Sequence, residues 1–296
     1  MRDKTLLLLI KRILDSLKNG NYTPDSFESE VLSLKDEKQN NHKTVRIDTP
    51  HNYSDTEIIF LLERAECYEK EGNHSEAIKC YGEIIAKLPD NSPYKPHTYI
   101  TRAHLFSSLS RWKEAIEDSK MALKLDPDST GGYLNVGAYL SMDLFYSGKF
   151  EFNKYNELFE ESIAYYKACL ERNPQSITAW LNIVETNMFM CRWDEAISYY
   201  GSCKPYIDTL EHQVIRAWLG SMAIVLAGDP LEREDTAILL ESKPAVGTLS
   251  YDINQMICVL AELKRTGYDP QKLNKAYWVH EKFLNRIGKE RGAGQI

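Results

Sequence analysis

The residue types that enzymes use for chemistry occur in this chain, but their spacing forms no catalytic motif. Glycine-containing stretches read GNYT, GNHS and GGYL, and none has the glycine spacing of a phosphate-binding loop. The sequence contains no HExxH, no GxSxG and no histidine pair at metal-ligand spacing. His74 is predicted in a turn, and His42 and His51 in a polar stretch, so we expect all three in solvent. We therefore predict a non-enzyme without metal or cofactor.

The six cysteines also lack the spacing of a metal or redox site, because no CxxC occurs. Cys191 falls near a predicted helix end beside Arg192, where its thiol could be exposed. Inside a helix, cysteine packs as a small hydrophobic residue. The five cysteines predicted inside helices are Cys67, Cys80, Cys169, Cys203 and Cys258. We expect reduced thiols in a cytoplasmic protein.

The overall charge and the N-terminal segment limit the classes of partner. The net charge of −7 argues against nucleic acid as a partner. The LLLLI run is five residues long and is bracketed by Lys4 and Lys11, too short and too charged to insert in a membrane. We predict an amphipathic helix over residues 4–18 that either packs on the rest of the protein or docks separately. The polar stretch over residues 36–54 is predicted to be a linker.

Three stretches of the chain share one pattern of large, small and aromatic residues. They read LLERAECYEKEGNHSEAIKCYGEIIAKLP from Leu61, YITRAHLFSSLSRWKEAIEDSKMALKLDP from Tyr99, and WLNIVETNMFMCRWDEAISYYGSC from Trp180. Each has a large residue, a small or similar residue four positions later, a turn, and an alanine that opens a second helix. The pattern resembles the tetratricopeptide repeat (TPR), a helix-turn-helix unit of about 34 residues.

The first two copies match the repeat well, and the third departs from it. The third copy keeps Ala196 and Tyr200 but has Val184 and Asn187 where the small residue and the aromatic are expected. Small residues allow two helices to cross closely, and a proline ends the second helix. The matching positions are Ala65, Tyr68, Ala77, Tyr81 and Pro89 in the first copy, and Tyr99, Ala103, Phe106, Ala115, Ala122 and Pro127 in the second.

A further unit lies between the second and third copies. It has Gly137 at the small position, Ser162 and Tyr166 in its second helix, and an insertion around residues 143–156. Ala115 and Ser162 are 47 residues apart, whereas Ser162 and Ala196 are 34 apart, which is the period of the repeat. We interpret the insertion as an extended helix end followed by a loop.

The resemblance implies an all-α fold, a TPR-like right-handed α-solenoid of antiparallel helix hairpins. Residues 1–55 would hold the N-terminal helix and linker, and residues 56–205 about four hairpins. Residues 206–296 would form degenerate helical repeats and a C-terminal cap, since terminal repeats are commonly atypical. Within this last part we predict helices over 210–227, 235–240, 250–266 and 270–287.

The resemblance also implies a binding surface, because the first helix of each hairpin lines the concave groove of such a solenoid. Asn135 and Asn182 take the same place in successive units, and an amide there can donate to and accept from a peptide backbone. A solvated or structural role for the two amides is the alternative. The predicted groove residues are Thr101, His104, Leu134, Asn135, Leu181, Asn182, Glu185 and Met188.

The same alignment predicts what the groove does not bind. Co-chaperone TPR domains hold a C-terminal carboxylate with lysine, arginine and asparagine, but here the matching places of the first unit carry Leu62 and Glu66. The groove is expected to be neutral, apolar and partly acidic. We predict a protein–protein interaction scaffold or adaptor that binds a peptide segment or a partner helix. Two alternatives remain: a peptide-sensing regulator with the N-terminal segment as its output, or a non-catalytic subunit of an enzyme complex.

Overall fold

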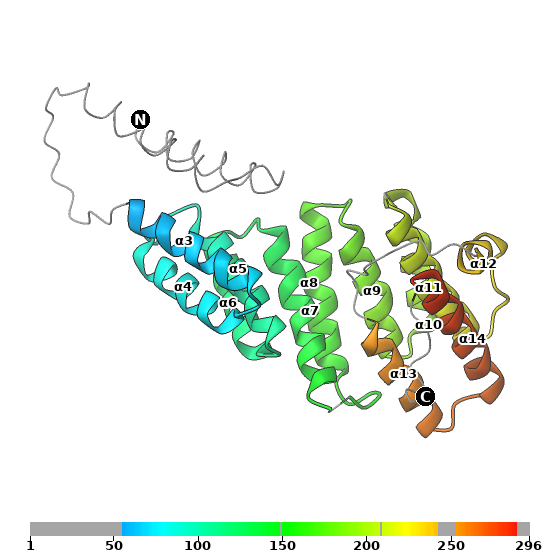
Figure 1. Ribbon diagram of the computed structural model, residues 1–296. Helices are drawn as coiled ribbons and strands as arrows, with labels where there is room; N and C mark the ends of the chain where they lie inside the picture. The colour runs from blue at the N-terminus through cyan, green and yellow to red at the C-terminus, as the bar shows by residue number, and fades with distance from the viewer. Residues whose placement is uncertain (1–54, 149, 208, 242–252, 289–296) are drawn as a thin grey trace, which may run out of the picture. The chain divides into compact units, whose positions relative to one another are not determined.

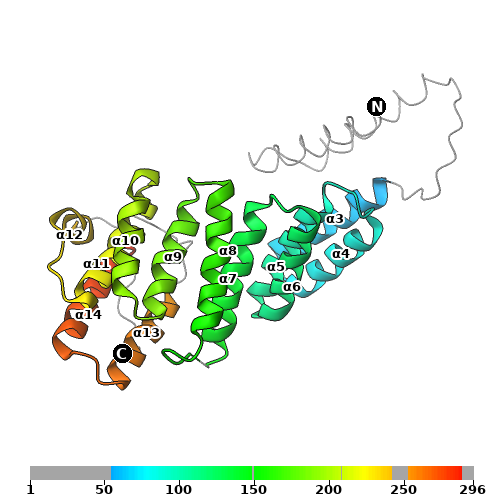
Figure 2. The same cartoon turned by 180° about the vertical axis from the view of Figure 1, so that it is seen from behind.

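The computed structural model describes residues 55–148, 150–207, 209–241 and 253–288, and the regular structure in these ranges is entirely helical, as predicted. Residues 1–54, with the predicted N-terminal helix and linker, lie outside the described part. Figures 1 and 2 show α3 to α10 stacked in chain order as antiparallel hairpins. The helices are α3 (Asp55–Lys70), α4 (His74–Lys87), α5 (Lys95–Ser108), α6 (Trp112–Leu125), α7 (Thr130–Tyr146), α8 (Asn156–Arg172), α9 (Ile177–Phe189), α10 (Trp193–Cys203), α11 (Leu210–Ala227), α12 (Arg233–Leu240), α13 (Asn254–Arg265) and α14 (Pro270–Arg286).

Three hairpins are closed by the same kind of turn. One residue in each turn has a left-handed backbone, and the next residue donates its N–H to a carbonyl five positions earlier. This pattern satisfies carbonyls at the end of the first helix and reverses the chain. The left-handed residues are Gly72 (φ 72°), Ser110 (φ 56°) and Cys191 (φ 56°). The hydrogen bonds run from Asn73 to Tyr68 (2.7 Å), from Arg111 to Phe106 (2.9 Å) and from Arg192 to Asn187 (2.9 Å).

The small residues of the repeats lie where the helices of a hairpin cross. Ala65 and Ala77 face the crossing of α3 and α4, and Ala103 and Ala115 that of α5 and α6; all four are fully buried. A longer side chain at any of them would hold the helices apart. The predicted register of the first two repeats therefore agrees with the packing.

The insertion in the third hairpin is an extended helix end followed by a loop, as predicted. Helix α7 continues to Tyr146, and α8 begins at Asn156. In the intervening loop, the Phe150 ring stacks on the Phe145 ring with centroids 4.4 Å apart. The loop is thus anchored to the core between α7 and α8 by an aromatic contact.

The hairpins form two layers of helices. In one layer, α5 contacts α7, α7 contacts α9 and α9 contacts α11. Among α4, α6, α8 and α10, the described residues make no comparable contact between successive members. Alternate helices come closer together on the inside of a curved stack, so we call α3, α5, α7, α9 and α11 the inner layer.

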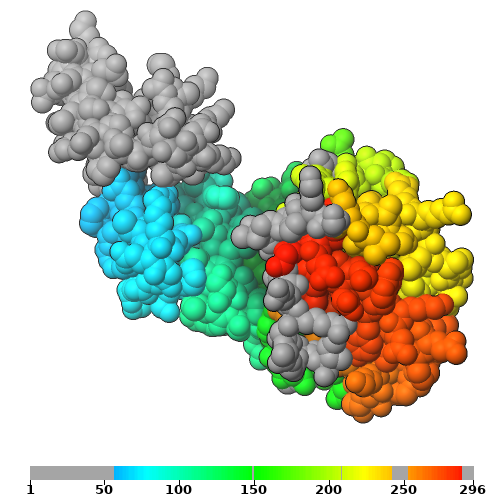
Figure 3. Space-filling view, turned by 45° about the vertical axis from the view of Figure 1, so that its right-hand side comes forward, coloured from blue at the N-terminus to red at the C-terminus, as the bar shows by residue number. Residues whose placement is uncertain are grey.

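The C-terminal helices pack around α11 and also reach back to α7. Every residue of α11 from Val214 to Leu226 is buried. This helix is buried because neighbours cover it on several sides, namely α9, α10, α12 and α14, and its buried Arg216 pairs with Asp235 of α12 at 3.3 Å. Helix α13 contacts α7, and the Asn254 amide donates to the Tyr146 hydroxyl at 3.4 Å. Figure 3 shows the orange and red surfaces of α13 and α14 beside the yellow surface of α12.

Some expectations about side-chain exposure are wrong. Cys67 and Cys258 are exposed on helix surfaces and do not pack as small hydrophobic residues. His74 is half-buried at the start of α4, whereas the sequence predicted a solvated turn. Since helical periodicity places a residue on a face only approximately, single exposed positions are easily assigned to the wrong face. The remaining cysteines agree with prediction: Cys80, Cys169 and Cys203 are buried and Cys191 is half-buried, and none of the six cysteines forms a disulfide within the described residues.

Candidate functional site

The inner layer brings two of the predicted groove residues together. His104 is exposed on α5, and Asn135 lies opposite it on α7 with 7% of its surface exposed. Asn135 Nδ2 is 3.4 Å from His104 Nε2, and the Tyr139 hydroxyl is 2.9 Å from His104 Nδ1. These three side chains form a polar cluster across the α5–α7 contact, which we call the His104 cluster.

The His104 cluster is uncharged at neutral pH. The His104 ring packs edge-on against Tyr139, with centroids 6.3 Å apart. Desolvation lowers the pKa of His104, and the nearby His97 lowers it further. Desolvation also raises the pKa of Tyr139 to about 12. The cluster therefore presents neutral hydrogen-bonding groups, which suit the amides of a peptide backbone better than a charged ligand.

Thr101 and Leu134 lie beside the cluster on the same two helices. Thr101 is half-buried about one turn before His104, and its hydroxyl donates to the His97 carbonyl at 3.2 Å. Leu134 is half-buried next to Asn135 and packs against the small core that includes Tyr166. Both retain some exposed surface next to His104 and Asn135.

Asn182 is not joined to the His104 cluster. It is half-buried on α9, and its side chain, like that of Ser141, is close enough to the Tyr166 hydroxyl to lower the pKa of that group. Tyr166 is buried between neighbouring hairpins. Asn135 and Asn182 have the same position in their repeats, but their surroundings differ. The Asn135 amide faces the exposed His104, and the Asn182 amide faces the buried Tyr166.

The remaining predicted groove residues lie in the core. Leu181 and Met188 were predicted to line the groove, but their side chains are only 1% and 0% exposed. They therefore offer no apolar surface to a peptide. Glu185 is 6% exposed; desolvation raises the pKa of the buried Tyr166, and the negative charge of Glu185 raises it further. Leu181 and Met188 belong to the same hydrophobic cluster as residues of α11 and α13. Helix α9 packs against α8, α10 and α11, so Leu181 and Met188 have no free apolar surface.

The α3 end of the inner layer is acidic. Desolvation raises the pKa of the half-buried Glu66, with further contributions from the carboxylates of Glu69 and Glu63, while Lys70 lowers it. Glu69 accepts a hydrogen bond from the Tyr81 hydroxyl at 2.7 Å. Three carboxylates, of Glu63, Glu66 and Glu69, thus lie at this end beside Lys70.

Sequence reasoning missed an aromatic group that extends the His104 cluster. Tyr139 lies four residues after Asn135 and therefore on the same face of α7, which is a spacing that could have identified it. Its ring is 6.3 Å from that of Trp112, which stacks on Tyr146 at 5.3 Å. Tyr146 is 47% exposed. A series of aromatic contacts, through the buried Tyr139 and the half-buried Trp112, thus joins His104 to Tyr146 at the C-terminal end of α7.

The described ranges contain neither a metal-binding group nor a membrane-spanning helix. No set of three or more histidine, cysteine, aspartate or glutamate side chains there could hold a metal ion. None of the helices described above has the length and apolar character needed to cross a membrane.

Known proteins match parts of this chain. Residues 60–91 and 153–176 match the tetratricopeptide repeat family, which places the first match over α3 and α4 and the second over α8. The mouse (Mus musculus) RNA polymerase II-associated protein 3 is 30% identical over 129 residues, covering 44% of this chain and 17% of that protein. The small glutamine-rich tetratricopeptide repeat-containing protein 2 of Saccharomyces cerevisiae is 28% identical over 125 residues, covering 40% and 34%.

The human (Homo sapiens) mitochondrial import receptor subunit TOM70 is 38% identical over 61 residues, which are 20% of this chain and 10% of that protein. This chain thus spans well under half the length of these relatives. A thermophilic TPR protein from Thermus thermophilus superimposes with a TM-score of 0.46 at 14% identity, covering 77% of this chain and 99% of that one. The repeated small residues, the shared hairpin turns and both family matches lead to one conclusion. The chain is a tetratricopeptide repeat protein.

Proposed function

We propose that this chain is a protein-interaction scaffold that binds an extended segment of a partner protein along α3, α5 and α7. The His104 cluster is the observation that carries this proposal. It places an exposed, neutral imidazole beside the Asn135 amide and the Tyr139 hydroxyl on the inner layer. Such groups can pair with backbone N–H and C=O groups of a peptide without requiring a particular side chain.

The same layer is less accessible farther along the chain. The side chains of Leu181, Glu185 and Met188 are buried, so α9 contributes little surface to a bound segment. Asn182 remains half-buried and would mark the far edge of the binding surface. A partner segment would therefore lie over α3, α5 and α7 and end near α9.

Charge on α3 constrains the partner. The carboxylates of Glu63 and Glu69 both raise the pKa of Glu66, whereas the positive charge of Lys70 lowers it. A cationic or neutral side chain of the partner would be favoured there, and a C-terminal carboxylate disfavoured. The exposed aromatic surface of Tyr146 would contact an apolar side chain at the opposite end.

The relatives support an interaction role without identifying the partner. Their names describe a polymerase-associated protein, an import receptor subunit and a repeat-containing protein. Because this chain matches only part of each relative, we extend to it the general role of binding proteins and no particular assembly.

Site-specific photo-crosslinking in the full chain tests the proposal. A benzophenone side chain would be placed at Thr101 in the inner layer or, as the control, at the exposed Glu117 on α6. We expect the probe at Thr101 to cross-link a defined partner segment. We expect the double change His104→Ala with Asn135→Ala to reduce that cross-link severalfold, because each lost hydrogen bond costs about 0.5–1.5 kcal/mol.

The folded state must be checked beside the binding readout. Circular dichroism should show the same helicity for wild type and the double variant. If the probe at Glu117 captures the same partner as strongly as the probe at Thr101, or if the double variant cross-links undiminished, the partner binds elsewhere and the proposal is wrong.

A further inference from the structure

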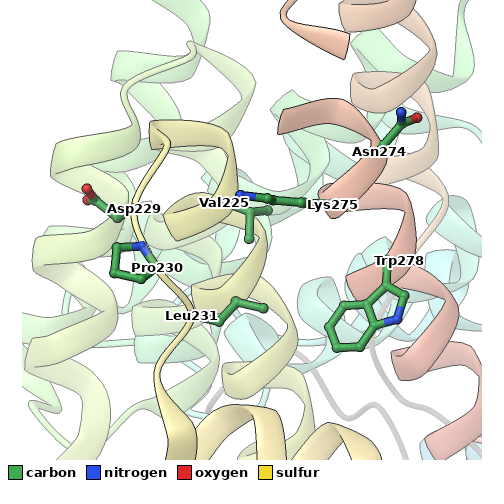
Figure 4. A pocket seen from close by; sticks show the side chains of 7 residues that line it. All are labelled: Val225, Asp229, Pro230, Leu231, Asn274, Lys275 and Trp278. Atoms are coloured by element: carbon green, nitrogen blue, oxygen red, sulfur yellow. The ribbon is translucent and has the colours of Figure 1, made fainter. Parts of the chain in front are cut away.

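A separate hollow lies at the C-terminal end of the repeats, between the end of α11, the loop that follows it and α14 (Figure 4). Its volume is about 370 Å³, which is at the lower end of the range for ligand pockets in proteins. The hollow lies away from the His104 cluster in sequence and shares no residue with it. The lining residues are Val225, Asp229, Pro230, Leu231, Asn274, Lys275 and Trp278.

The walls of this hollow are tied together by hydrogen bonds to the end of α11. Lys272 Nζ donates to the Ala227 carbonyl at 2.8 Å, and the Tyr268 hydroxyl donates to the Leu226 carbonyl at 2.5 Å. Gly228 ends α11 with a φ of 107°, and a Cβ there would lie 2.9 Å from Lys272. These contacts hold α14 against α11, so the hollow exists before any ligand binds.

The floor of the hollow is apolar. Val225 is 1% exposed, and Leu231 and Trp278 are half-buried with their inner surfaces against the main core. In Figure 4 the Leu231 side chain points toward the Trp278 ring. A leucine- or phenylalanine-sized group placed between them would bury apolar surface on both sides, which is favourable at about 25 cal/mol per Å².

One cationic side chain, Lys275, lines the opening of the hollow. Lys275 is exposed, forms no ion pair with the other described residues, and reaches from α14 toward Val225 in Figure 4. Lys282 lies outside the lining, with its Nζ 5.8 Å from the centre of the Trp278 ring and 4.0 Å from Glu281 Oε1. The carboxylate of Asp229 points away from the space between α11 and α14 in the same view. A ligand that enters the hollow therefore meets positive charge next to the apolar floor.

We propose that this hollow binds a leucine or phenylalanine side chain of a partner peptide that has an aspartate or glutamate next to it. The apolar side chain would occupy the space between Leu231 and Trp278, and the neighbouring carboxylate would pair with Lys275. One lysine without an arginine is a poor match for a phosphate group, which prefers several donors or a bidentate fork. This site does not depend on the proposed function of the inner layer.

Nuclear magnetic resonance of the full-length protein can test the site, because Trp278 lies in its wall. The chain has five tryptophans, so the indole N–H signals of the other four serve as internal controls. The probes are three blocked tripeptides: acetyl-Glu-Phe-Glu-amide, acetyl-Lys-Phe-Lys-amide and acetyl-Glu-Ala-Glu-amide. We expect saturable shifts of the Trp278 signal with the first peptide, and much weaker shifts with the other two.

Two variants assign the charge preference to one side chain. Lys275→Gln should weaken binding of the acidic phenylalanine peptide severalfold, whereas Lys264→Gln, an exposed lysine on α13 outside the hollow, should leave it unchanged. Both positions are exposed, so neither change should prevent folding. An unmoved Trp278 signal, equal binding of the cationic peptide, or equal binding by Lys275→Gln and Lys264→Gln would each overturn the proposal.

Discussion

The Tyr166 ring occupies the space beside the Gly137 backbone, so that a Cβ at Gly137 would lie 2.6 Å from Tyr166 Cε1. The two residues come from the two helices of the third hairpin, α7 and α8. Tyr166 is 2% exposed and cannot move aside without disturbing the core. The absence of a side chain at position 137 therefore permits the close approach of these helices.

Gly137→Ala should destabilise the protein by about 1–3 kcal/mol, because the added methyl group overpacks against Tyr166. Urea unfolding followed by circular dichroism measures the change. Gly201→Ala on α10 is the matched control, since a Cβ there meets nothing within 4 Å. In the control, alanine should stabilise the helix by about 0.5–1 kcal/mol. Equal effects of the two substitutions would contradict this account of the third hairpin.

Ala115→Leu should also destabilise, because Ala115 is fully buried where α5 and α6 cross. The expected cost is about 1–3 kcal/mol from displaced neighbours. A thermal melt compares this variant with Met121→Leu, which changes an exposed residue on the same helix. An unchanged melting temperature for Ala115→Leu would mean that this position does not lie in the crossing.

The ion pair between Arg102 and Asp118 joins the two helices of the second hairpin through two bonds of 2.7 Å. Asp118 is 5% exposed, so Asp118→Ala should cost about 3 kcal/mol by leaving the guanidinium without its counter-ion. The double change Arg102→Met with Asp118→Ala should recover part of that loss.

The exposed ion pair Lys79–Glu76 serves as the control for this prediction. Glu76→Ala should change the free energy of unfolding very little, because surface ion pairs contribute weakly. Chemical denaturation of wild type, the two single variants and the double variant gives the comparison. If the double variant is less stable than Asp118→Ala, the unpaired charge of Arg102 is not the main cause of the destabilisation by Asp118→Ala.

His280 should make stability fall in acid. Burial against Trp218 lowers its pKa from 6.5 to about 4. A depressed pKa means that the folded state disfavours the charged form, so stability is complete above pH 6.5 and declines as the pH falls toward 4. The decline attributable to this group is at most about 3 kcal/mol.

The variant His280→Leu removes the titrating group while keeping an apolar packing surface. Urea unfolding at a series of pH values should show that the stability difference between wild type and His280→Leu shifts in favour of the variant as the pH falls. A difference that is constant across the range would show that His280 titrates alike in the folded and unfolded states.

Most helix bounds could be predicted from the sequence because they depend on local interactions. Helix α11 was predicted over 210–227 and extends over the same residues. Apolar periodicity, proline and glycine act within a few residues of their own position, so they mark helices without knowledge of the rest of the fold. The small residues Ala65 and Ala115 likewise predicted helix crossings, since a close crossing requires a small side chain wherever it occurs.

Tertiary packing decided which side chains of the inner layer remain accessible. Leu181 and Met188 have the repeat positions of groove residues, but they are buried in a hydrophobic cluster that α9 shares with α8, α10 and α11. The contact between His104 and Tyr139 likewise joins positions 35 residues apart. Local pattern determines which face of a helix is apolar, whereas its exposure depends on what distant segments pack against it. For this protein the sequence therefore determined the helical repeats, and only the folded structure showed that their inner surface is open at α5 and α7 and closed at α9.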